Sequence, residues 1–328
     1  MDTATHIVIG FGLAGLATLD PAVAGSAATM QAVTLATVVG SVIPDIDTVL
    51  KLKNNALYIR NHRGMTHSLP FLAMWSLLLA TVLSLAIPGS GGASLYLWSL
   101  AAVSLHVFSD IFNAYGTQAA RPASQRWIAL GIINIFDPFI FSLHILGFLL
   151  WLVDGHPGQT FATIYGVIIV YYVLRTWQHH RTIQAVRRQL PGAVNILLSP
   201  TLRWSRYHIC AASRTRYYVG KMDGTKLQLI DTFVKQPVDL TSEVMCSALN
   251  DKNVRAFLSF SPMYRWSISE RKHHWIVQFT DLRYVSKGVY TFTATAEINQ
   301  DLSVRSSYTG WVFSEQKLEK KLVPTHVK

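Results

Sequence analysis

Residues 44–68, PDIDTVLKLKNNALYIRNHRGMTHS, decide how the rest of the chain is organised. This stretch places two carboxylates, Asp45 and Asp47, and two imidazoles, His62 and His67, between two apolar segments. Carboxylate oxygens and imidazole nitrogens are ligands for borderline and hard divalent metal ions. The stretch therefore predicts a metal site at a membrane surface.

Composition divides the chain into two parts. Half of the 328 residues are hydrophobic and the mean hydropathy is +0.28, which is high for an ordinary soluble protein. Up to Trp177 the apolar runs carry few charges, whereas from Gln178 onward charges are frequent and the pattern becomes short and alternating. We expect a membrane-embedded α-helical bundle over residues 1–177, a basic linker over 178–200 and a small β-rich soluble domain over 201–328.

Six apolar segments in the first part are candidate membrane helices, although several are shorter than the roughly 20 residues that a perpendicular span needs. They are His6–Leu19, Gln31–Asp47, Ser68–Ile87, Leu95–Asn113, Pro138–Val153 and Thr160–Trp177. Lys and Arg occur only in alternate connections between these segments. Under the positive-inside rule, six spans place every basic connection, both termini and the soluble domain on the cytoplasmic side.

This topology brings possible metal ligands from separate segments to one end of the bundle. His106 and Asp110 are four residues apart, so they share one face of a helix and suit two ligands of one metal, or a ligand and its orienting partner. An ionisable pair inside an apolar span is costly and indicates function, whereas the alternative is a hydrogen bond that only joins helices. The predicted ligands are His6, Asp45, Asp47, His62, His67, His106, Asp110 and Asp137.

Asp45 and Asp47 also suit a catalytic role. Carboxylates two residues apart point to different sides of a helix, so either Pro44 loosens the backbone or only one of them binds metal directly. One acid could then bridge metals while the other acts as a general base. The alternative is a polar end of a span, which does not require two acids where cytoplasmic ends usually carry Lys or Arg.

The remaining ligands have plain structural alternatives. His62 and His67 are five residues apart and would splay on a helix, but Gly64 favours a turn that aims both rings inward. His6 alone is a weak signal at a polar helix start. Asp137 precedes a proline, which is a common pairing at a helix N-terminus.

Basic residues at the same end suggest a substrate site. Arg63, Arg121 and Arg126 could clamp a phosphate, or they could reflect only topology and contact with lipid headgroups. The net charge of +11 also raises the possibility of nucleic acid, but Lys and Arg form no single stripe, so no nucleic-acid partner is expected. Cys210 and Cys246 form no CxxC pair, which argues against a zinc ribbon or a disulfide framework.

Alternating runs rich in Tyr, Val, Thr and Phe follow the Pro191-Gly192 break. These runs predict strands separated by turn signals such as Met222-Asp223-Gly224. The predicted strands are Arg216–Gly220, Leu227–Ile230, Trp275–Thr280, Val289–Ala296 and Ser303–Thr309. This domain contains no cluster of acids and histidines that predicts chemistry, so we assign it to support or recruitment.

Several of these motifs resemble a known family. Thr5-His6, PDID at 44–47, HRGMTHS at 62–68, His106-x-x-x-Asp110 and NAYGT at 113–117 look like the YdjM-type bacterial inner-membrane-associated metal-dependent hydrolases. The resemblance covers about Met1–Asp154 and implies a multi-pass protein of the bacterial inner membrane. A more distant resemblance to zinc-dependent phospholipase C implies Zn²⁺, although an HxxxE ligand pair is missing here.

The combined expectation is a membrane-bound hydrolase that holds one to three divalent metal ions, most simply Zn²⁺. Its substrate would be a phosphoester or a phospholipid-like amphiphile at the cytoplasmic membrane face, with membrane lipid as its surroundings. The rival interpretation is a non-enzymatic membrane protein, in which the same polar cluster joins helices or binds a structural metal while the β-rich domain recruits a partner.

Overall fold

The computed structural model describes residues 1–286 and 288–322, which form two compact units. The first unit comprises Met1–Asp47, Arg63–Thr182 and Ser199–Trp204. The second comprises Thr48–His62, Ile183–Leu198 and Ser205–Lys328. The short segment 48–62, which lies inside the stretch that organises the sequence, therefore belongs with the C-terminal half of the chain.

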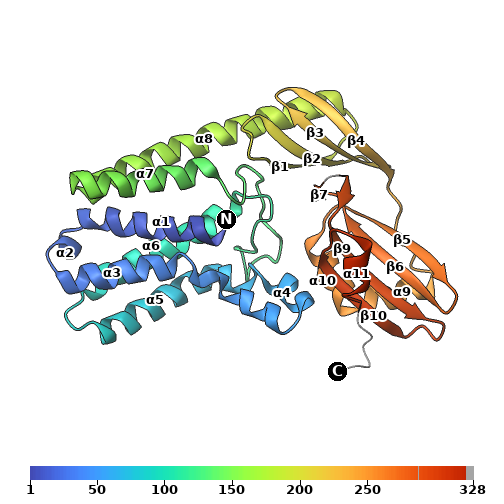
Figure 1. The fold of residues 1–328 in the computed structure, drawn as a ribbon, viewed down its shortest axis with the longest axis horizontal. Coiled ribbons are helices and arrows are strands. Elements are labelled where there is room, and N and C mark those ends of the chain that lie inside the picture. Colours follow the sequence, from blue (N-terminus) through green and yellow to red (C-terminus); the bar gives the residue numbers. More distant parts are fainter. Residues whose placement is uncertain (287, 323–328) are drawn as a thin grey trace. The chain divides into compact units, whose positions relative to one another are not determined.

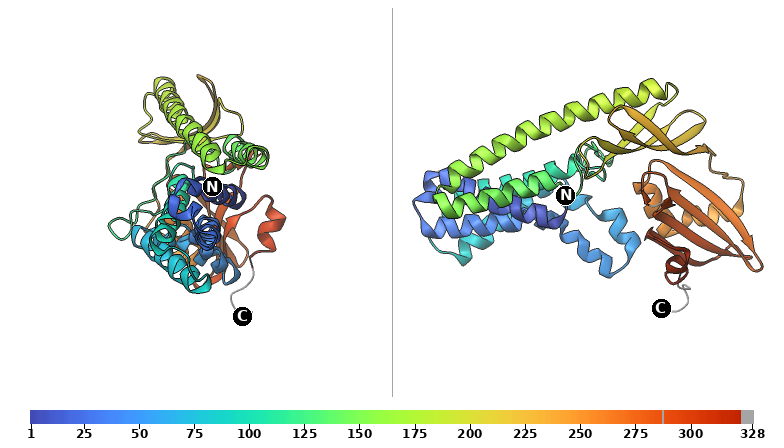
Figure 2. Two further views of the ribbon diagram at one scale, coloured as in Figure 1. Left: turned by 90° about the vertical axis from the view of Figure 1, so that its left-hand side faces the viewer. Right: turned by 45° about the horizontal axis from the view of Figure 1, so that its top comes forward.

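Helices build the first unit and run side by side in it (Figures 1 and 2). They are α1 (Thr3–Leu16), η1 (Ala17–Leu19), α2 (Pro21–Ala24), α3 (Ala27–Gly40), η2 (Ile43–Leu52), η3 (Met65–His67), α5 (Leu69–Ala86), α6 (Gly92–Ile111), α7 (Pro138–Asp154) and α8 (Pro157–Gln189). Both η2 and α8 continue across a boundary into the second unit.

Three of the described helices, α5, α6 and α8, are long and apolar enough to cross a membrane. The pair of α3 and η2 adds a fourth span if it is counted as one, with a bend of 46°. The expected helical, membrane-type first part is confirmed, but the count of six apolar spans is not. Helices α1 and α7 are apolar but have only 14 and 17 residues, which at about 1.5 Å per residue fall short of a bilayer core of about 30 Å.

The bend between α3 and η2 has a local cause. Pro44 has no backbone N–H and cannot continue the α-helical hydrogen bonds of α3. The chain tightens instead, with the Asp45 amide donating to the Val42 carbonyl at 3.1 Å. The tight turn carries Asp45 and Asp47 to the polar end of the unit.

Two apolar cores hold the helices of the first unit together. One core joins α1, α6, α7 and α8 around Phe161, and the other joins α3, α5 and α6 around Leu95. Gly10 lets α1 approach α3 closely, because a Cβ atom there would lie 2.8 Å from Val38 Cα. This close contact places the start of α1, with His6, against the other helices.

Strands dominate the second unit, so the predicted β-rich domain is confirmed. They are β1 (Asn195–Pro200), β2 (Arg206–Ala212), β3 (Arg216–Asp223), β4 (Lys226–Val234), β5 (Tyr264–Arg271), β6 (His274–Asp281), β7 (Val285–Ser286), β8 (Val289–Tyr290), β9 (Phe292–Asn299) and β10 (Val304–Trp311). They form two four-stranded antiparallel sheets, ordered β1-β2-β3-β4 and β10-β9-β6-β5, and a β7-β8 pair.

Helices α9 (Glu243–Asn250) and α10 (Lys252–Phe260) cover the second sheet, and α11 (Glu315–Glu319) follows it. Their core gathers Phe257, Phe279 and Phe292. Helix α4 (Asn55–Asn61) packs on α10 and β10, and the Asn55 side-chain amide donates to the Thr309 carbonyl. The alternating pattern predicted β3, β4, β6, β10 and the region of β8 and β9, but it missed β1, β2, β5 and β7. It also missed these helices, which are short and carry no long apolar period.

Candidate metal centre

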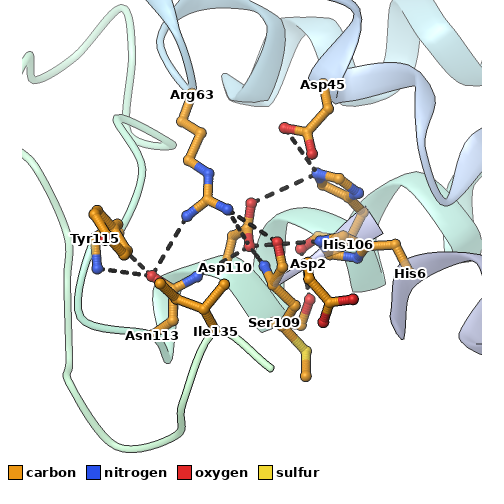
Figure 3. A network of polar contacts seen from close by, with 12 residues as sticks. Asp2, His6, Asp45, Arg63, His106, Ser109, Asp110, Asn113, Tyr115 and Ile135 are labelled. Carbon is orange, nitrogen blue, oxygen red and sulfur yellow. Dashed lines mark hydrogen bonds and ion pairs between the residues drawn. The ribbon is translucent and has the colours of Figure 1, made fainter. Parts of the chain in front are cut away.

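Four side chains meet at the polar end of the first unit. Helix α6 supplies His106 and Asp110 from one face, as their spacing predicted, while η3 supplies His67 and η2 supplies Asp45. Three of the four are buried, and Asp45 keeps 19% of its side chain exposed. Figure 3 shows Asp45, His106 and Asp110 together, with His6 beside them.

The hydrogen bonds of the two histidines fix which nitrogen carries the proton. His106 Nδ1 lies 2.6 Å from the Ser41 carbonyl, which can only accept, so Nδ1 is the donor. The Thr66 hydroxyl donates its single proton to Asp47 at 2.8 Å and lies 3.1 Å from His67 Nδ1, so that nitrogen is also a donor. Both Nε2 atoms therefore present lone pairs, and they face each other at 3.2 Å.

Four acceptor atoms thus converge at one point. They are His67 Nε2, His106 Nε2, Asp45 Oδ1 and Asp110 Oδ2, and five of their six separations lie between 3.2 and 3.8 Å. A tetrahedron with edges of about 3.5 Å has its centre about 2.1 Å from each corner, which is the usual distance from Zn²⁺ to a histidine nitrogen or a carboxylate oxygen. The donor set fits a divalent metal ion.

The unused hydrogen-bonding capacity of the site supports the same conclusion. Among the described residues, Asp45 Oδ1 and Asp110 Oδ2 are buried and have no hydrogen-bond partner. A buried carboxylate oxygen without a partner costs free energy unless a cation compensates it. The Ser41 carbonyl and the Thr66 hydroxyl are the outer contacts that orient metal-binding histidines.

Asp110 also anchors a second set of contacts through its other oxygen. Oδ1 contacts the Met1 amino group, lies 3.2 Å from an Arg63 guanidinium nitrogen and accepts from the Asn113 side chain at 3.1 Å. Figure 3 shows Arg63 and Asn113 converging on this carboxylate. These donors leave Oδ2 as the oxygen that faces the histidines.

Asp47 points away from this group, so the two acids of PDID have different partners. Its carboxylate accepts from the Arg63 backbone amide at 2.9 Å and from the Thr66 hydroxyl. Arg63 adopts a left-handed backbone with φ of 58°, which is unusual for a residue with a side chain. Asp47 thereby stabilises the turn that places His67.

His6 lies inside the site without belonging to the group of four. Its ring stacks on His106 with 3.8 Å between centroids, and its Nε2 is 3.5 Å from Asp110 Oδ1. The side chain is buried, and within residues 1–286 and 288–322 neither ring nitrogen has a hydrogen-bond partner.

Burial sets the charge state of His67. It lowers the pKa of His67 to about 4, and the neighbouring Asp45 carboxylate opposes this shift only in part. His67 is therefore neutral near pH 7. A neutral imidazole is the form that binds a metal.

Asp137 and His62 are not among these four ligands. Asp137 caps α7, as its proline neighbour allowed: it accepts from the Phe139 and Ile140 amides, and from the Tyr171 hydroxyl at 2.7 Å. His62 belongs to the second unit, where it ends α4 and stacks on Tyr58.

The predicted phosphate clamp has a different arrangement from the one expected. The Arg63 guanidinium is buried and turned inward onto Asp110, Asn113 and the Met1 carbonyl. Arg121 is half-buried and Arg126 is exposed on the segment that connects α6 to α7. Arg63 thus supports the cluster from within.

Sequence reasoning missed the residues that orient the ligands. Asn113 is the clearest case, because its carbonyl oxygen accepts from the Tyr115 and Gly116 amides while its amide group donates to Asp110. Its spacing of three from Asp110 was a usable signal. Ser41 acts through its backbone carbonyl, so its side chain carries no sequence signal.

Comparison with known proteins agrees with a helical, membrane-type first unit followed by separate domains. A helical membrane-type domain with a buried His/Asp cluster defines the class, and the chain belongs to the YdjM inner membrane protein family, whose model matches residues 1–182. Residues 191–233 match the YfhP middle domain, and residues 243–322 match the YfhP C-terminal alpha/beta plait domain. This result confirms the resemblance seen in the sequence.

One curated relative covers nearly the whole chain. The uncharacterized protein YfhP of Bacillus subtilis (strain 168) is 49% identical over 323 residues, which is 98% of each chain. No solved structure matches. The relatives therefore establish the family and its membrane association.

Proposed function

We propose that this protein is a membrane-bound, metal-dependent hydrolase that acts on a phosphoester or phospholipid-like substrate at the cytoplasmic membrane face. The observation that carries the proposal is the convergence of four acceptor atoms from three separate elements. The basic connections between the apolar segments support the cytoplasmic side.

Each residue of the site has a distinct task under this proposal. His67, His106, Asp45 and Asp110 hold the metal, and Asp45 marks its open side because it alone among the four keeps exposed surface. Asp47 positions His67 through Thr66. A bound divalent metal would polarise the ester and lower the pKa of a water molecule toward neutrality. His6 stacks on His106 beside the group of four.

A structural metal is the second candidate, and one observation favours it. Four protein donors fill a tetrahedral coordination sphere, which is typical of closed structural zinc sites, whereas catalytic sites keep a position open. Metal binding is common to both candidates. Hydrolytic turnover distinguishes the hydrolase from the structural site.

Metal content is the first test. Purified protein should contain about one or more equivalents of a divalent metal, and His67→Ala should lower the metal affinity by at least about tenfold. His156→Ala is the matched control, because His156 is exposed in the connection between α7 and α8. Equal metal affinity in the two variants would contradict the assignment of His67 as a metal ligand.

Hydrolysis is the second test. The metal-loaded protein is assayed against phosphomonoesters, phosphodiesters and phospholipid vesicles, with Asp45→Asn beside wild type. Turnover that requires metal and falls with Asp45→Asn while His156→Ala stays active supports the hydrolase. Stoichiometric metal without turnover on any of these substrates would favour the structural candidate.

A further inference from the structure

Helix α8 shows where its apolar surface ends. From Pro157 to Trp177 it carries one charged residue, Arg175, and at about 1.5 Å per residue this stretch is about 30 Å long, which is the thickness of a bilayer core. Trp177 is exposed, and the guanidinium of Arg181, one turn further on, lies 4.8 Å from the centre of its ring. Exposed Trp and basic side chains are typical of the layer of lipid headgroups. Trp177 therefore marks the level at which α8 leaves the membrane core.

The loop between β1 and β2, residues 201–205, is fixed at the same level. Ser199–Trp204 belongs to the helical unit, although most of both strands belongs to the second unit. The Trp204 carbonyl accepts from the side chains of Arg175 and Gln178, each at 2.9 Å. Its ring meets the Tyr171 ring edge to face, with 5.3 Å between centroids. The loop and the last apolar turns of α8 thus form one surface.

The charge of Arg175 holds the loop in this place. The side chain is buried within the apolar stretch of α8, where an uncompensated charge is costly. Its guanidinium donates to the carbonyls of Ile132 and Trp204 and to the Gln178 side chain, and it lies over the Trp204 ring at 5.1 Å. The loop therefore compensates this charge, which fixes the position of Trp204 relative to α8.

The tip of the loop turns apolar side chains outward. Leu202 is 67% exposed and Trp204 is 48% exposed, and the Arg203 side chain between them is exposed as well. Phe139, which is exposed at the start of α7, stacks on Tyr171 and extends this apolar surface. Large apolar side chains beside a basic one suit the headgroup layer, because that layer accommodates both apolar groups and positive charge.

We propose that the loop of residues 201–205 lies in the headgroup layer at the membrane face where α8 ends its apolar run. Leu202 and Trp204 insert among the lipids, and the Arg203 guanidinium binds the phosphate of an anionic phospholipid. The partner of this surface is therefore the membrane itself. The contact lies outside the metal centre, so it does not depend on the proposed hydrolysis.

The test measures the depth of the loop in full-length protein reconstituted in lipid nanodiscs. In a background with Cys210 and Cys246 replaced by Ser, Ser205→Cys carries an environment-sensitive fluorophore. Thr215→Cys is the control, because it lies in the turn between β2 and β3, about 20 Å away along the seven residues of β2. A lipid with a quencher near its headgroup should quench the label at position 205 but not at 215, and aqueous iodide should do the reverse.

Two further variants test the side chains that carry the contact. Leu202→Asp should expose the label at position 205 to iodide, whereas Val194→Asp, at an equally exposed apolar position before β1, should not. Arg203→Gln should remove the gain in lipid quenching that phosphatidylglycerol gives over phosphatidylcholine alone, a change of about fivefold in the equilibrium between inserted and exposed loop.

Metal content should stay at the wild-type level in all of these variants, which separates this proposal from that of the metal centre. Equal quenching by iodide at positions 205 and 215 would overturn the proposal. Protection of position 205 from both quenchers would overturn it too, because the loop would then lie against protein.

Discussion

At the scale of single residues, proton positions decide what the cluster can bind. His67 and His106 each donate the Nδ1 proton to an oxygen outside the group. The lone pairs of their two Nε2 atoms then point at each other. Without those outer oxygens, one Nε2 could carry a proton and donate it to a carboxylate, which would produce a hydrogen-bonded cluster. The outer contacts therefore separate a metal site from a polar network.

Thr66→Val tests this argument with a nearly isosteric change. It removes the hydroxyl that bridges Asp47 and His67, and we expect metal affinity to fall by about 10- to 100-fold, which is the range for loss of an outer contact. Thr163→Val is the control, since that hydroxyl is exposed and bonds only within α8. Competition with a chelating dye measures both affinities. A loss of less than about twofold in Thr66→Val would mean that the hydroxyl does not set the tautomer.

His67 also predicts a pH dependence of stability in metal-free protein. Its pKa of about 4 in the folded state lies below the ordinary histidine value of about 6.5, so between these values the unfolded chain binds more protons. The contribution to stability is present above pH 6.5 and is lost as the pH falls toward 4. Chemical unfolding across this window should show a steeper loss in wild type than in His67→Gln. If the free energy of unfolding fell equally with pH in wild type and His67→Gln, the lowered pKa of His67 in the folded protein would be contradicted.

At the scale of elements, close helix packing carries the site. Helix α1 brings His6 to the cluster because Gly10 allows it to lie against α3, where a Cβ atom would come within 2.8 Å of Val38 Cα. The tight turn at Pro44 brings Asp45 back over the end of α6. The close approach at Gly10 and the turn at Pro44 are both properties of the backbone, and neither depends on the polar residues of the site.

Gly10→Ala should therefore disturb the site from a distance. We expect a loss of about 1–3 kcal/mol in the free energy of unfolding from overpacking, together with weaker metal binding as α1 shifts. Gly166→Ala is the matched control, because no atom lies within 4 Å of a Cβ added there in α8. Its stability should be unchanged or slightly higher, since Ala favours a helix more than Gly does. Calorimetry of the two variants measures the difference.

At the scale of the whole molecule, the distribution of Lys and Arg predicts which ends of the helices face the cytoplasm. In a background with Cys210 and Cys246 replaced by Ser, a membrane-impermeant thiol reagent applied to intact cells should label Ala93→Cys and His156→Cys. It should not label Lys53→Cys or Ala123→Cys, which lie in basic connections. All four positions are exposed in the structure, so accessibility within the protein does not confound the result. External labelling at Lys53→Cys would place the metal centre on the other side.

The sequence by itself determined the family, the division into a helical and a β-rich part, and the pairing of His106 with Asp110. These features follow from composition and from short, regular spacings, which local backbone geometry converts directly into shared faces. The count of six spans is not confirmed, because the length of an apolar run does not by itself give the length of the helix that forms there. Helices α1 and α7 begin at Thr3 and Pro138 and end after 14 and 17 residues.

Only the tertiary structure decided which acid faces the histidines and what orients them. Asp45 and Asp47 are alike in sequence, yet one meets His67 and the other holds the Arg63 turn. His67 and His106 are 39 residues apart, and their meeting depends on how α5 and α6 pack. Segment 48–62 joins the second unit for a similar reason, since α4 packs on α10. Such contacts between distant segments arise from the burial of whole helix faces, which no local spacing encodes.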